Sequence, residues 1–192
     1  LRFDANADST VSLGVNTLTV HGTTFGNFAG GGILVNSNVG TANKTITGGV
    51  LTTVNNGELI VHHYGNGTLN IGSQIGASGA APGRVIVTGP SVTGADQLAA
   101  WSTSTTGQVV LSGANETAAV ETRWLLNGST LSIDAENRLG KVALAAATSD
   151  AVYMNGGALR YTGNGYTALD INRGFTIGGN GGVIDVVDGN AN

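Results

Sequence analysis

Very short strand motifs recur along this chain, separated from one another by glycine and asparagine. Since side chains alternate across a strand, an apolar, a polar and an apolar residue in succession predict a strand with one buried face. A strand of this length is unstable alone, so it needs a similar strand on either side. The chain is therefore expected to wind into stacked coils. The motifs are Leu18-Thr19-Val20, Leu69-Asn70-Ile71, Leu131-Ser132-Ile133, Leu159-Arg160-Tyr161 and Phe175-Thr176-Ile177.

Composition agrees with a chain that turns often and forms little helix. Glycine accounts for 32 of the 192 residues and proline for 2, which excludes collagen and proline-rich linkers and leaves tight turns as the use of glycine. Charged residues make up 10%, yet no apolar run approaches the roughly 20 residues of a membrane-spanning helix. Only residues 94–100 and 115–126 have any helical periodicity, and the second stretch is a spacer between strands.

Residues 1–192 are expected to form a single β-solenoid, with an irregular loop or distorted coil at residues 91–106. The clearest internal repeat aligns Asn127–Leu131 with Asn155–Leu159, 28 residues later, and Gly181–Ile184 follows after another 26. With coils of roughly 20 to 28 residues, the chain would supply about eight. The outer members of each motif, such as Leu131 and Ile133, are predicted to line the interior, and Ser132 to face water.

Charge and cysteine content exclude several classes of partner and site. The formal net charge is −4 and the pI about 5.1, so the eight scattered lysines and arginines cannot form a stripe that follows phosphates. Anionic membranes are disfavoured for the same reason. Cysteine is absent, which leaves no disulfide and no thiolate metal site.

Four longer motifs follow one another between Thr106 and Val187: TGQVVLSGANET, LLNGSTLSIDAENRLG, YMNGGALRYTG and INRGFTIGGNGGVIDV. Their order resembles the passenger-associated strand repeat of Gram-negative autotransporters, which use type V secretion. GELIVHHYGNGTLNIG, residues 57–72, is similar to a second repeat type of the same passengers. The chain departs from the family pattern after LSGAN, where residues 116–119 replace the usual aromatic residue and paired glycines.

The resemblance implies an all-β fold, a right-handed parallel β-helix, displayed extracellularly on the bacterial cell surface. It implies that the parent chain is anchored to the outer membrane by a C-terminal β-barrel that these residues do not contain. Adhesion to host molecules or cells, a virulence-associated and non-enzymatic role, is the favoured function. The partner would be a host surface protein or glycan, or another copy of the chain. A self-associating aggregation or biofilm rod, a polysaccharide-acting β-helix enzyme and an inert stalk are the alternatives.

No catalytic residue, cofactor or metal site is predicted. The closest aspartates, Asp185 and Asp188, would fall on opposite faces of a strand and so cannot form the carboxylate pair of a hydrolase; turn or cap positions explain them. His62 and His63 likewise point to opposite sides of a strand, and His21 would be needed as a third ligand.

Aromatic side chains are the candidates for ligand contact, because they bury large areas and are enriched at interfaces. Packing of loops onto the solenoid is the alternative role for the same residues. Four N-x-[ST] sequons are expected by chance in a chain so rich in Asn, Ser and Thr, and in a bacterium they would stay unmodified. The candidate contacts are Trp101, Tyr64, His62 and Tyr166, and Trp124 is a further aromatic that could contact a sugar or a protein. The sequons begin at Asn43, Asn66, Asn115 and Asn127.

Overall fold

A computed structural model describes residues 1–20, 30–54, 57–76, 83–89, 107–115, 122–140, 147–163 and 169–187. Within these residues the chain forms strands and two short 3-10 turns, η1 (Ser37–Val39) and η2 (Glu136–Leu139), and no α-helix. No helix in the described ranges has the length and apolar character needed to cross a membrane. The all-β expectation is confirmed.

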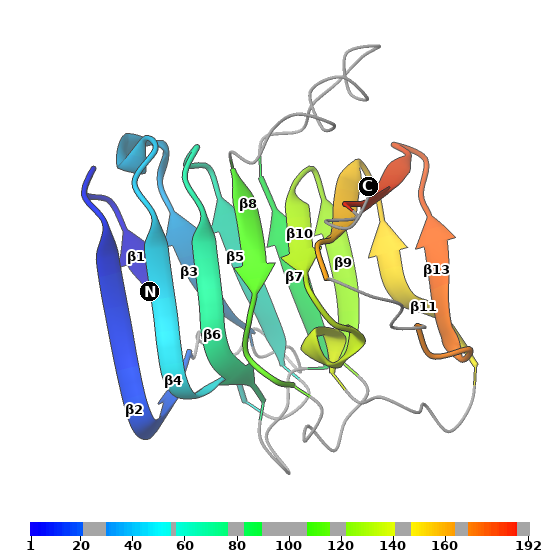
Figure 1. Ribbon diagram of the computed structural model, residues 1–192, viewed down its shortest axis with the longest axis horizontal. Coiled ribbons are helices and arrows are strands. Elements are labelled where there is room, and N and C mark those ends of the chain that lie inside the picture. The colour runs from blue at the N-terminus through cyan, green and yellow to red at the C-terminus, as the bar shows by residue number, and fades with distance from the viewer. Residues whose placement is uncertain are drawn as a thin grey trace.

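The described strands form two parallel sheets that face each other, and the chain visits them alternately (Figure 1). Parallel neighbours come from successive coils, as a β-helix requires. Sheet A contains β1 (Arg2–Phe3), β3 (Gly30–Val35), β5 (Glu58–His63), β7 (Arg84–Thr88), β9 (Arg123–Asn127), β11 (Thr148–Met154) and β13 (Arg173–Ile177). Sheet B contains β2 (Ser9–Thr19), β4 (Lys44–Thr52), β6 (Leu69–Ile75), β8 (Gln108–Leu111), β10 (Thr130–Ile133), β12 (Gly157–Tyr161) and β14 (Gly182–Val186).

The described residues provide seven strands in each sheet, and therefore seven coils rather than about eight. One reason is a long coil: Leu69 of β6 aligns with Val109 of β8, and residues 90–106 lie between them. The expected loop at residues 91–106 falls outside the described residues.

The register confirms one predicted repeat and corrects the next. Leu131 aligns with Leu159, as the 28-residue repeat predicted. Leu159 then aligns with Ile184, and Gly157 with Gly182, so the following repeat is 25 residues long and not 26. The glycine-rich sequence before β14 can be aligned in two ways, and a slip of one residue would turn every apolar side chain of the strand outward.

Apolar ladders from both sheets fill the interior. Leu131 and Ile133 are 0% and 1% exposed, as predicted, whereas Ser132 is only 3% exposed and does not face water. In the register Ser132 lies between Val110 and Arg160, whose longer side chains stand on the same outer face and shield it. The alternation of this strand was therefore predicted correctly, but the exposure of its outer residue was not.

The LSGAN motif forms a corner where two coils approach closely. The Ser112 hydroxyl donates a hydrogen bond to Asn70 Oδ1 at 2.8 Å, one coil earlier. A Cβ atom on Gly113 would lie 2.4 Å from the carbonyl oxygen of Ser73, so only glycine fits there without a backbone shift. The motif is thus a packing feature of stacked coils.

Asn115, the last residue of LSGAN, is 2% exposed and links three coils. Its Oδ1 accepts a hydrogen bond from the Ile75 amide at 2.6 Å, and its Nδ2 donates to the Arg138 carbonyl at 2.6 Å. This burial excludes glycosylation of Asn115 in the folded chain and gives the residue a structural role that its sequon did not suggest.

Candidate ligand-contact surface

The outer face of sheet A carries three parallel rows of side chains across β5, β7, β9 and β11. The rows arise because these strands are aligned without an offset between β5 and β9, so every second residue of each strand faces outward at the same height. The charged row is Glu58, Arg84 and Arg123; the apolar row is Ile60, Ile86, Leu125 and Tyr153; the polar row is His62, Thr88 and Asn127.

Two of the predicted contact residues lie together at the β5 end of the polar row. His62 is half-buried, Tyr64 is 42% exposed, and their rings stack with centroids 6.2 Å apart and an interplanar angle of 9°. The pair presents an aromatic surface to solvent at the C-terminal end of β5. Trp101 and Tyr166, the other two predicted contacts, lie outside the described residues.

His63 points into the core, opposite His62, so the two imidazoles cannot bind one metal ion. It is 1% exposed and continues the inward-facing position of Val35 on β3, rather than standing at a corner. Burial lowers the pKa of the His63 imidazole to about 4, although nearby backbone carbonyls of His63 and Gly67 favour its protonated form. His63 is therefore neutral at physiological pH.

Two ion pairs involve the charged row, one within it and one with Asp150 of β11. Arg84 Nη1 lies 3.2 Å from Glu58 Oε1, and Arg123 Nη1 lies 3.0 Å from Asp150 Oδ2. Asp150 reaches this position because β11 has an irregular register between Thr148 and Val152, and such bulges redirect side chains. All four side chains are between 35% and 50% exposed, so solvent weakens both pairs.

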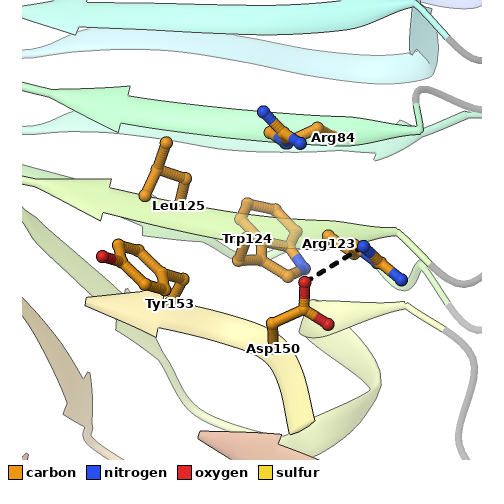
Figure 2. Close-up of a pocket in the computed structure, with 6 residues that line it drawn as sticks. All are labelled: Arg84, Arg123, Trp124, Leu125, Asp150 and Tyr153. Carbon is orange, nitrogen blue, oxygen red and sulfur yellow. Dashed lines mark hydrogen bonds and ion pairs between the residues drawn. The ribbon is translucent and has the colours of Figure 1, made fainter. Parts of the chain in front are cut away.

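A cavity of about 240 Å³ lies between the arginines of these ion pairs and two members of the apolar row, Leu125 and Tyr153 (Figure 2). Trp124 borders it but is 1% exposed, and its Nε1 donates to the Leu139 carbonyl at 2.9 Å, so the indole belongs to the core and is not the exposed contact residue that the sequence allowed. The wall thus combines two guanidinium groups, one carboxylate, one aromatic ring and one aliphatic side chain. The lining residues are Arg84, Arg123, Trp124, Leu125, Asp150 and Tyr153.

The described residues contain no group of three or more His, Asp or Glu side chains that could hold a metal ion. Asp185, predicted to sit at a turn or cap, lies instead within β14 and forms an ion pair with Arg160 at 3.0 Å. The turn prediction was wrong because an outward strand position next to an arginine also accommodates an aspartate. Asp188, its possible partner in a carboxylate pair, lies outside the described residues.

Sequence reasoning missed the cavity because its residues come from three coils. Arg84 and Arg123 are far apart in the chain, and the parallel register alone brings them together. One signal was present: ELIV, RVIV and RWLL each begin with a charged residue followed by an apolar run. Aligning these three motifs would have placed Glu58, Arg84 and Arg123 in one row.

Comparison with known proteins shows that the chain is similar in sequence to an autotransporter. No family model matches the chain, and no solved structure matches it. The whole chain is 31% identical over 199 aligned residues to the adhesin BmaC autotransporter of Brucella suis biovar 1 (strain 1330), and it spans 5% of that relative's length. This similarity confirms the resemblance to autotransporter passengers that the strand motifs predicted.

Proposed function

We propose that this chain is a segment of a surface-displayed autotransporter passenger and acts in adhesion to host molecules or cells, without enzymatic activity. The 192 residues would act as a single solenoid unit outside the bacterial outer membrane. The observation that carries the proposal is the similarity of the whole chain to an autotransporter adhesin. The regular outer rows support it, because side chains repeated at the spacing of the coils can make many weak contacts that add up along the rod.

Bead adhesion tests this function. Latex beads coated with the chain should adhere to cultured epithelial cells, and excess soluble chain should compete and remove most of the bound beads. Beads coated with heat-unfolded chain are the control, because they carry the same composition and charge without the ordered faces. Adherence equal to that of the unfolded control would contradict the proposal.

Self-association is a second candidate function, favoured by the outer face of sheet B. Thr10, Thr45 and Asn70 form an uncharged row across β2, β4 and β6, and such groups can hydrogen-bond to a second copy. In the same assay, beads that clump without host cells would favour this function. Thr45→Lys with Asn70→Lys should then abolish the clumping, because like charges would meet at the contact.

A further inference from the structure

The two arginines of the cavity occupy aligned positions on neighbouring strands, and each forms an ion pair with a carboxylate of a third or fourth strand. Along the charged row the order is Glu58, Arg84 and Arg123, and Asp150 of β11 pairs with Arg123 at the end of the row. Since adjacent strands are about 4.8 Å apart, the backbones of Arg84 and Arg123 are neighbours, and both side chains line the cavity. An anion in the cavity would therefore have two arginines within its lining.

Both guanidinium groups retain donors for such an anion. The ion pairs with Glu58 and Asp150 engage one Nη1 atom of each arginine, whereas a guanidinium carries five N–H donors. The side chains of Arg84 and Arg123 are 47% and 50% exposed, so an external ligand can reach them. Paired arginines favour planar carboxylates, which accept two parallel hydrogen bonds.

The other residues of the cavity favour a ligand that carries more than an acid group. Asp150 offers a carboxylate that accepts hydrogen bonds from a hydroxyl or amide of the ligand, and it is 43% exposed. Tyr153 and Leu125 provide an aromatic ring and an aliphatic side chain (Figure 2). A matching ligand therefore combines a carboxylate, a hydrogen-bond donor and an apolar ring face in one small unit.

We infer that the cavity binds a carboxylate-bearing sugar, a sialic or uronic acid residue of a glycan. Its carboxylate would lie between Arg84 and Arg123, a hydroxyl would donate to Asp150, and the C–H face of its ring would pack on Tyr153. This inference rests on the proposed adhesive function and names the ligand class of one surface on the chain.

Charge and size favour a sugar over an acidic peptide or a sulfated polymer. A run of acidic groups would meet Glu58 and Asp150 at both sides of the arginines, and the chain as a whole carries a charge of −4. The cavity of about 240 Å³ is below the roughly 300 to 1,000 Å³ of pockets for drug-sized ligands, which suits one monosaccharide unit.

Saturation-transfer NMR and titration with 3′-sialyllactose and glucuronic acid test the inference on the 192-residue chain. Both should bind, and the uncharged counterparts lactose and glucose should bind at least tenfold more weakly. Arg84→Gln with Arg123→Gln should lower the affinity for the two acids at least tenfold. Because exposed ion pairs contribute little to the stability of a fold, this double variant should stay folded.

Matched variants distinguish sugar recognition at the cavity from a general effect of positive charge on the chain. Arg2→Gln removes another exposed, ion-paired arginine, on β1, and should leave sugar binding unchanged. Tyr153→Phe keeps the ring and should bind the acids within twofold of the original chain, whereas Tyr153→Ala should bind them several-fold more weakly. The melting temperature of each variant verifies that the solenoid is intact.

Equal binding of sialyllactose and lactose, or unchanged binding by the double arginine variant, would overturn the inference. Tighter binding of a poly-glutamate peptide than of either acid sugar would overturn it in favour of an acidic peptide. Bead adhesion distinguishes its failure from that of the proposed function. Beads that adhere although the chain binds no acid sugar would refute the inference alone, and a chain that binds the sugars without adhering would refute the adhesive function alone.

Discussion

At the scale of single residues, buried polar groups hold neighbouring coils together. The buried ion pair between Arg173 and Glu136 has an N–O distance of 3.0 Å, and Glu136 also accepts a hydrogen bond from the Asp170 amide at 2.7 Å. Lys44 is 1% exposed, and its ammonium group donates to backbone carbonyls of the first coil. Each group is satisfied by partners from another coil, so removing one partner would leave a buried charge uncompensated.

His63 should make stability depend on pH. Its pKa is about 4 in the folded chain and about 6.5 in the unfolded chain, so the unfolded chain binds more protons between these values. The contribution of His63 to the free energy of unfolding is therefore fully present above pH 6.5 and falls by about 3 kcal/mol as the pH decreases to 4. Urea unfolding at several pH values between 4 and 7.5 measures this loss.

Substituting each of the two adjacent histidines in turn tests whether His63 causes the pH dependence of stability. His63→Leu removes the buried imidazole and should flatten the pH dependence between 4 and 6.5 by most of that amount. His62→Leu, on the outer face of the same strand, should leave the slope as it is. An identical slope in the two variants would show that His63 is not its source.

At the scale of strands and corners, glycine allows successive coils to approach. Gly113→Ala would place a methyl group against backbone atoms of Ser73 and Gly72, which cannot move without shifting β6. We expect it to lower the free energy of unfolding by about 2 kcal/mol or more. Gly179→Ala, where no atom lies within 4 Å of the added group, should change it by about 0.5 kcal/mol or less. Similar losses at both positions, measured by denaturant unfolding, would contradict the close-approach argument.

At the scale of strands, part of the structure could be predicted from the sequence and part could not. Strand positions such as Leu131 to Ile133 follow from alternation, because a β-helix repeats one local pattern. The 25-residue spacing of Leu159 and Ile184 does not, since consecutive glycines permit two alignments. The alignment of Arg84 with Arg123 was missed because coil length varies along the chain, although both residues begin a motif in which an apolar run follows a charged residue.

At the scale of the whole molecule, the two ends of the stack differ from its sides. Among the described strands, β13 and β14 each have one neighbouring strand. Apolar residues of these two strands are exposed: Ile177 is 59%, Ile184 52% and Val186 67% exposed. At the opposite end, Val15 of β2 is 96% exposed. Edge strands with unpaired backbone groups and apolar side chains favour pairing with another chain.

The 192-residue chain should therefore associate end to end at high concentration, and sedimentation velocity should detect this. Ile184→Lys with Val186→Lys should shift the population toward monomer, because charges on an edge strand oppose pairing. Val15→Lys determines the orientation: it should also favour monomer if β2 meets β14 of a second copy, and have no effect if β14 meets β14. Association that neither end variant reduces, but that Thr45→Lys with Asn70→Lys abolishes, would show lateral contact through sheet B. The rod would then pair along its side, and self-association would become the better explanation of its function.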